Sequence, residues 1–306
     1  MDDRDALVRR HFTDVLLVPT TSAGTTDDWT SHPPAGDPPV NLGKGIWLEH
    51  LDDPETFMLA CEARGENFNP KRQFGQRYSF IRRDAPGDAC NWDADTSMHA
   101  IVALSRLILS NAYSTTYAAR IEEASGSRPR EVVPVHEPTR FEAWVPAPTR
   151  RDWLDHEEAL ALAALAARYW KSGGTLPRRI SNALWLCEYG YRIYWADVRW
   201  PHTVTALEAL LSTDRKNLRA QFVKRSTAMA AEFGLTGFDE HFAHRAYTAR
   251  SEAVHGSRVR FEDNSKAANE LDLLETLLRC ALRKAIEDEQ FRSSFTDEGV
   301  RQRWPV

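Results

Sequence analysis

The segment Arg250-Ser-Glu-Ala-Val-His255 holds two side chains that together suit acid–base chemistry at a phosphate group. A histidine titrates near neutral pH and can take up or release a proton. An arginine keeps its charge and can stabilise the negative oxygens of a transition state. The pair fits RNA cleavage by the RNA's own 2′-hydroxyl, a reaction that requires no metal ion, and we expect no cofactor.

The pair lies near the end of a predicted amphipathic helix over residues 238–256. Apolar residues recur along one face in steps of four and three, at Phe238, Phe242, Ala246, Ala249 and Ala253. Arg250 replaces an apolar residue at the edge of this stripe. Gly256 is a residue that ends many helices. His255 therefore falls in the last turn, where the negative end of the helix dipole favours its protonated form.

The spacing alone is weak evidence for a site. Arg250 and His255 are about 500° apart around a helix, so they do not share one face. The same spacing recurs at Arg151 and His156, in a predicted linker or first turn. With ten histidines in the chain, about one such spacing is expected by chance. The alternative interpretation is a surface arginine and a histidine that ends a helix.

Two motifs in the C-terminal half resemble the HEPN superfamily, and especially its Apea-like branch. The segment 247–256 is similar to the Tyr…Arg-x4-His-Gly helix of that superfamily. Upstream, the segment 204–211 is similar to the first-helix LEALL motif of the branch, and polar Asp197 and Arg199 precede it. The motifs lie in the expected order with one further helix between them.

The resemblance implies an all-α domain, a homodimer in which two such helices meet, and a metal-independent endoribonuclease of a toxin or antiphage-defence system. In these terms Arg250 and His255 are catalytic, Ser251 orders substrate or water, and Tyr247 supports the pocket. Active members usually carry Asn, Asp or His where this chain has Ser251. The second hypothesis is therefore a non-catalytic HEPN module that binds RNA or nucleotide, or mediates dimerisation within a defence complex.

Glu208 and Asp197 are the predicted partners of Arg250. Glu208 neighbours an apolar row on its helix, where an unpaired carboxylate would be expensive to bury. We therefore expect Glu208 or Asp197 to hold Arg250 over the site. The alternative for Glu208 is an exposed acid on the free side of its helix.

Length and composition predict a two-domain α+β protein. The 306 residues suffice for two cores. We expect a mixed α/β domain over 1–148 and an all-α HEPN domain over 149–306. The first would be the sensor or target-recognition part. The net charge of −5 argues against a protein that coats nucleic acid through bulk electrostatics. The chain shows no signal peptide, no apolar run near ~20 residues and no paired cysteines, so we expect a cytoplasmic protein without a membrane span.

The N-terminal half carries strand and helix patterns but no recognised chemical motif. The β-branched and aromatic content predicts strands, and an apolar stripe predicts a helix over 95–109. A short helix over 54–63 and a basic loop over 67–76 are also expected. The segment 146–150 is a plausible domain junction. The predicted strands span 77–82, 113–121, 131–135 and 140–145.

The C-terminal half is predicted to be helical from Asp155 onward. Alanine- and leucine-rich periodicity predicts helices over 157–170, 178–189, 192–212 and 214–233, and a final one from about 264. Pro201 is expected to break or kink the third, and the tail after Ser294 is expected to be loosely ordered. Aromatic residues between Trp185 and Trp200 suit base stacking, or else a core or dimer surface. The helix that Asp214 is predicted to cap is the most basic helix of the chain. It is a candidate path for an RNA backbone, or else its basic side is an ordinary solvated face. Its basic residues are Arg215, Lys216, Arg219, Lys224 and Arg225.

Overall fold

The computed structural model describes nine stretches of the chain. They are 12–16, 38–50, 78–82, 97–111, 118–122, 131–133, 154–193, 196–255 and 264–306. The predicted short helix over 54–63, the basic loop, the strand over 140–145 and Gly256 lie outside them.

The chain divides into two compact units. The first contains the strands, and the second contains most of the helices. The division falls within α3 (Ser97–Ile108) and within α4 (His156–Lys171), each of which contributes to both units. The predicted boundary between residues 148 and 149 lies outside the described residues and stays a prediction.

The first unit is built on a six-stranded antiparallel sheet in the order β2-β3-β4-β1-β5-β6. The strand β1 lies inside the sheet, where Val15 is opposite Ile81 of β4 on one side and Ala119 of β5 on the other. The predicted α+β class is confirmed. The strands are β1 (Phe12–Leu16), β2 (Val40–Gly43), β3 (Ile46–His50), β4 (Tyr78–Arg82), β5 (Ala118–Glu122) and β6 (Glu131–Val133).

A tight turn joins β2 to β3. Lys44 and Gly45 both have positive φ, of 54° and 71°, as the backbone twist of short hairpins requires. On either side of the turn Val40, Ile46 and Leu48 are buried. The alternation of buried and accessible residues along β2 is the pattern of a strand with one face on the core.

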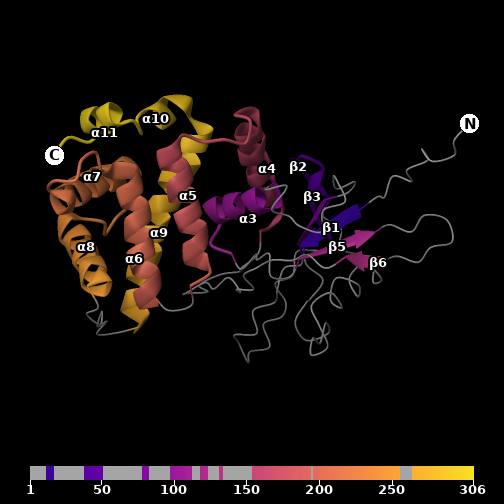
Figure 1. The fold of residues 1–306 in the computed structure, drawn as a ribbon, viewed down its shortest axis with the longest axis horizontal. Helices are drawn as coiled ribbons and strands as arrows, with labels where there is room; N and C mark the ends of the chain where they lie inside the picture. The colour runs from indigo at the N-terminus through magenta and orange to yellow at the C-terminus, as the bar shows by residue number, and fades with distance from the viewer. Residues whose placement is uncertain are drawn as a thin grey trace, which may run out of the picture. The chain divides into compact units, whose positions relative to one another are not determined.

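The second unit is a helical bundle centred on α6 (Figure 1). The helix α6 packs against α5, α7, α8 and α9, so it touches each of the other long helices that lie wholly in this unit. Its buried side chains include Trp200, Leu207 and Leu211. The helices are α5 (Arg178–Tyr191), α6 (Ala196–Leu211), α7 (Leu218–Glu232), α8 (Glu240–Val254), α9 (Asn264–Glu287), α10 (Glu289–Ser293) and α11 (Asp297–Arg303).

Apolar periodicity located most of these helices. The predicted stripe of α9 is buried throughout. Pro201 lies inside α6, and the helix continues through it. The buried leucines of α9 are Leu271, Leu274, Leu277, Leu278 and Leu282.

The start predicted for α7 was wrong. The helix begins at Leu218, four residues later than expected, after Asn217 in the left-handed conformation at φ 54°. Asp214 does not cap it. Its carboxylate instead accepts hydrogen bonds from the backbone N–H of Lys216 at 2.8 Å and from Gln221 Nε2 at 3.1 Å. Asp214 therefore closes the turn that precedes α7.

The prediction of a loosely ordered tail was also wrong. Residues 297–303 form α11, whose first turn is capped by the hydroxyl of Thr296. Behind it Trp304 is buried against Phe291 and Phe295, with ring centroids 6.0 and 5.5 Å away. The carbonyl of Trp304 accepts a hydrogen bond from Arg225 Nε at 3.1 Å. Aromatic packing and this arginine fix the end of the chain.

Within the described ranges, no helix is both long and apolar enough to cross a membrane.

Candidate functional site

The candidate site lies at the end of α8, where its packing against the core runs out. Asp239 caps the start of the helix by accepting the backbone N–H of Phe242 at 2.7 Å. In the first turns the predicted stripe is buried, and Ala246 offers its carbonyl to Trp200 Nε1 of α6 at 3.1 Å. At the other end Val254 is 59% exposed. The last turn of α8 therefore projects beyond the apolar core.

Arg250 is held by a carboxylate and an aromatic ring. Its Nη2 lies 3.2 Å from Glu208 Oε2 of α6, and the side chains of the two residues are 26% and 10% exposed. The guanidinium carbon lies 5.9 Å from the centre of the Tyr247 ring. Tyr247 also hydrogen-bonds to Glu208, and the centre of its ring lies 5.5 Å from the centre of the Phe222 ring. The predicted contact between Glu208 and Arg250 is confirmed.

Burial sets the electrostatics of this group. Loss of solvent raises the pKa of Glu208 above its ordinary value, although the Arg250 charge and the Tyr247 hydrogen bond act in the opposite direction. The pKa of Tyr247 is raised as well, first by burial and then by the nearby Glu208 charge. Glu208 thus orients Arg250 at a cost in desolvation free energy.

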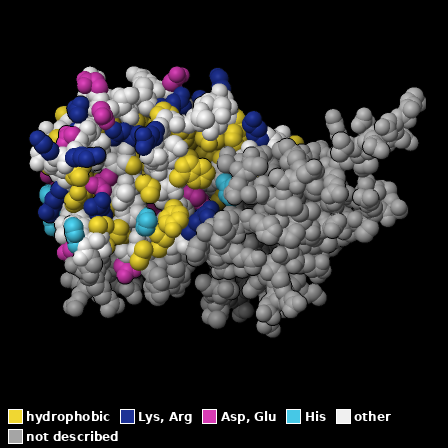
Figure 2. Space-filling view, viewed as in Figure 1, with side chains coloured by type: hydrophobic (Ala, Val, Ile, Leu, Met, Phe, Trp, Pro, Cys, Tyr) yellow, Lys and Arg dark blue, Asp and Glu magenta, His cyan; other side chains and the backbone are white. Residues whose placement is uncertain are grey.

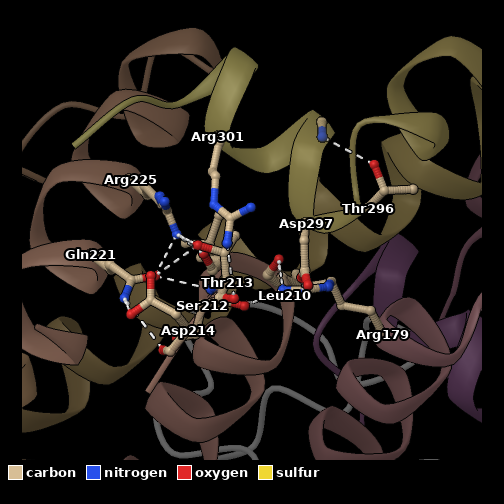
Figure 3. A network of polar contacts seen from close by, with 12 residues as sticks. Arg179, Leu210, Ser212, Thr213, Asp214, Gln221, Arg225, Thr296, Asp297 and Arg301 are labelled. Atoms are coloured by element: carbon tan, nitrogen blue, oxygen red, sulfur yellow. Dashed lines mark hydrogen bonds and ion pairs between the residues drawn. The ribbon is translucent and has the colours of Figure 1, made fainter. Parts of the chain in front are cut away.

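The end of α6 that carries Glu208 is fixed by arginines from three other helices (Figure 3). Arg179 of α5 donates to the carbonyl of Leu210 at 3.1 Å, and Arg301 of α11 donates to that of Thr213 at 3.4 Å. Arg225 of α7 donates to the carbonyl of Leu211. Cations at a helix C-terminus satisfy its free carbonyls and oppose its dipole. The position of Glu208 is therefore set by the whole bundle.

His255 and Ser251 occupy the last turn of α8. The backbone N–H of His255 donates to the carbonyl of Ser251 at 3.1 Å, and the His255 side chain is exposed. From Arg250 to His255 the helix advances about 7.5 Å and turns about 140° beyond a full revolution. The two groups thus leave α8 in different directions, with His255 facing solvent and Arg250 held towards α6.

Asp197 does not share a site with Glu208. It is half-buried in the first turn of α6, eleven residues before Glu208, which is about 16 Å along the helix axis. Its neighbour Arg199 is buried and pairs with Glu275 of α9 through two contacts, at 2.5 and 2.8 Å. Glu208 is thus the residue of the upstream motif that pairs with Arg250.

Sequence reasoning missed the buried ionic network around Arg199. The ring of Tyr191 lies between two guanidinium groups, 4.3 Å from Arg199 and 4.6 Å from Arg106, and its hydroxyl accepts from Arg279. Glu275 continues the leucine stripe of α9, four residues after Leu271 and three before Leu278. An acid in that position of an apolar stripe was the signal that a buried partner had to be present.

Of the five basic residues on the candidate RNA path, four divide into two pairs. Arg219 donates to His244 Nδ1 at 3.2 Å and to Thr248 Oγ1 at 3.1 Å, and Lys224 pairs with Glu240 at 2.7 Å. Arg215 and Lys216 are exposed in the turn before α7. In Figure 2, Lys and Arg side chains lie over α7 with acidic side chains among them. The fifth, Arg225, is buried and bonded within the bundle, so its place on the RNA path was predicted wrongly.

The described residues contain no group of three or more His, Cys, Asp or Glu side chains placed to hold a metal ion. Comparisons of the chain with protein-family models, with curated proteins and with solved structures find no match. The HEPN resemblance remains a prediction that rests on the motifs of the chain itself.

Proposed function

We propose that the chain is a metal-independent endoribonuclease of the HEPN type that acts in a toxin or antiphage-defence system. The observation that carries the proposal is the Glu208–Arg250 ion pair, which holds a guanidinium near the end of α8, five residues before an exposed His255. An arginine with no role beyond solubility would leave its side chain free in water. Here Glu208 of α6 pairs with Arg250, and the Tyr247 ring of α8 lies beside the guanidinium. Phe222 of α7 packs against Tyr247 and so supports that ring.

The reaction follows from the two side chains. The 2′-hydroxyl oxygen attacks the adjacent phosphorus and loses its proton, and the bond from phosphorus to the 5′-oxygen breaks as that oxygen gains a proton. His255 moves the proton, and Arg250 stabilises the charge on the non-bridging oxygens. The products are a 2′,3′-cyclic phosphate and a 5′-hydroxyl. Ser251 orders substrate or water, and Arg215 and Lys216 contact the RNA backbone.

A homodimer would bring an Arg250 and a His255 side chain together, although the two leave any one helix in different directions. Arg250 and His255 leave one helix in directions about 140° apart. In a dimer whose α8 helices meet, as the HEPN resemblance implies, Arg250 of one protomer faces His255 of the other. The exposed Val254 lies on the turn that such a contact would cover. The helical unit is in this account an all-α HEPN domain of a cytoplasmic dimer.

The test is cleavage of a mixed RNA pool that includes tRNA, in EDTA, by wild type, Arg250→Ala and His255→Ala. We expect only wild type to cleave, since each group contributes about 10²- to 10³-fold or more to such a reaction. Matched controls are Arg245→Ala and His241→Ala, which remove the same residue types from exposed positions on α8. Equal cleavage by all five proteins would contradict the assignment.

One observation favours the second candidate, a non-catalytic HEPN module that binds RNA or nucleotide, or dimerises, within a defence complex. Glu208 already offsets the charge of Arg250, which weakens its attraction for a phosphate. A wild-type protein that binds RNA but does not cleave it, with binding weakened in Arg250→Ala, would select this candidate.

A further inference from the structure

One face of α5 carries aromatic and cationic side chains in a single solvent-facing stripe. Its members are Arg178, Asn182, Trp185, Tyr189 and Arg192, spaced four, three, four and three residues apart. At about 100° and 1.5 Å per residue they fall within a sector of about 80° and extend for about 21 Å. Trp185 is 40% exposed and Tyr189 is 54% exposed. Two large accessible rings about one helical turn apart form an exposed apolar patch of the kind that marks interaction sites.

The stripe continues onto α6. The ring of His202 lies 5.5 Å from that of Tyr189, and Val198 next to it is 47% exposed. In Figure 2 hydrophobic side chains gather on this face over α5 and α6, with Lys or Arg and His side chains beside them. Burial lowers the pKa of His202, which favours the neutral form of its ring.

We propose that this stripe, here called the α5 stripe, binds single-stranded RNA by stacking bases on Trp185 and Tyr189. It rests on the proposed function and names how that enzyme holds its substrate. The two aromatic positions are about 6 Å apart along the helix, whereas bases stacked in one strand are about 3.4 Å apart. Each ring therefore takes a separate, unstacked base, which a single strand offers and a duplex does not.

The charges of the stripe favour a polyanion. Arginines lie at both ends, an amide lies between them, and none of the five positions is a carboxylate. Arg192 pairs with Glu188 at 3.8 Å, but Glu188 is buried and also pairs with Arg106 at 3.1 Å. The Arg192 side chain is 21% exposed, so this end of the stripe presents a guanidinium to solvent.

The same charges disfavour a second copy of the chain as the occupant. A twofold contact through α5 places the same patch on both subunits. With the two helices antiparallel, Arg178 of each protomer would face Arg192 of the other, which is a contact between like charges.

The stripe also lies within reach of the candidate active site. The helix α6 packs against α5 on one side and α8 on the other, and the three run side by side in Figure 1. Two interaxial distances amount to about 20 Å. A bound strand of four or more nucleotides, the usual span of such sites, covers that distance.

The experiment measures binding and cleavage separately. A fluorescein-labelled 12-nucleotide single-stranded RNA is titrated with His255→Ala protein, in which cleavage is removed, and with the same protein carrying Tyr189→Leu, Trp185→Leu or Tyr189→Phe. Leucine keeps apolar bulk without a π face, whereas phenylalanine keeps the face and loses only the hydroxyl. We expect the dissociation constant to rise about tenfold for each leucine variant and to stay unchanged for Tyr189→Phe. A duplex of the same sequence should not distinguish the variants.

Unchanged RNA affinity in both leucine variants overturns the inference, and cleavage by a protein with intact Arg250 and His255 would then leave the proposed function standing. Weakened RNA binding in the leucine variants, together with no cleavage by wild type, supports the stripe and counts against the nuclease. If light scattering shows that Trp185→Leu changes the oligomeric mass while RNA affinity is unaffected, the stripe is a contact between copies and the RNA proposal is wrong.

Discussion

Replacing Glu208 by glutamine should leave the protein at least as stable as wild type near pH 8, whereas replacing it by alanine should destabilise it. Arg250 Nη2 and Glu208 Oε2 are 3.2 Å apart, which gives a gross attraction of about 5 kcal/mol at an effective dielectric constant near 20. The raised pKa of Glu208 means that the cost of burying its charge exceeds what Arg250 and Tyr247 return. The ionised carboxylate is therefore a net loss of folding free energy.

Glutamine removes that loss and keeps an oxygen that accepts hydrogen bonds. We expect Glu208→Gln to match wild type or exceed it by about 1 kcal/mol at pH 8. Alanine leaves Arg250 and Tyr247 without their acceptor, and we expect Glu208→Ala to lose about 2 kcal/mol. Since glutamine still positions Arg250, RNA cleavage should survive in Glu208→Gln and fall in Glu208→Ala.

The pH dependence shows whether the Glu208 charge stabilises or destabilises the fold. Below the ordinary pKa of 4.5 the carboxyl is protonated in both the folded and the unfolded chain, so burial carries no penalty. As the pH rises towards and through the raised folded pKa, the unfolded state loses the proton first and wild type loses stability relative to Glu208→Gln. Urea unfolding at pH 4 and pH 8 measures both differences. If Glu208→Gln is less stable than wild type at pH 8 and the gap closes at pH 4, the charge stabilises the fold and the reasoning is wrong.

Three further outcomes follow from buried groups of the helical unit. Glu275→Leu removes the carboxylate that pairs with buried Arg199 and should cost about 3–5 kcal/mol in urea unfolding. Adding Arg199→Met should recover most of the loss, and an unrecovered loss would contradict the pairing. Burial raises the pKa of Cys187 to about 12, so at pH 8 only about one thiol in ten thousand is ionised. Peptide mapping after treatment with N-ethylmaleimide should therefore find Cys187 labelled only when the protein is unfolded in denaturant. Trp304→Ala should cost about 3–5 kcal/mol, and a loss below 1 kcal/mol would show that the tail is dispensable.

Local pattern was sufficient to place α8 and its site. The helix was predicted over 238–256 and spans 240–254, because apolar periodicity and helix-ending residues are local signals. The Glu208 contact was also predictable, since a carboxylate beside an apolar row requires a partner. What remained open was the choice between Glu208 and Asp197, which depends on where α8 crosses α6.

The errors fall where distant residues decide the local structure. The tail forms α11 because Trp304 finds an aromatic pocket, and nothing within 297–306 encodes that pocket. The start of α7 depends on the left-handed conformation of Asn217. Asparagine tolerates this conformation, but its presence in a sequence does not predict it. In the sheet, β1 lies between β4 and β5, a pairing across more than sixty residues that no local pattern specifies.

Cleavage of RNA through its 2′-hydroxyl by Arg250 and His255 is tested most directly with a matched pair of substrates. One is an all-ribose oligonucleotide that wild type cuts at a mapped position, and the other carries a single 2′-O-methyl group there. In EDTA, cleavage of the first with a 2′,3′-cyclic phosphate end and no cut at the methylated position is the predicted result. A cut at the methylated position, or a product with a 5′-phosphate and a free 3′-hydroxyl, would contradict the mechanism.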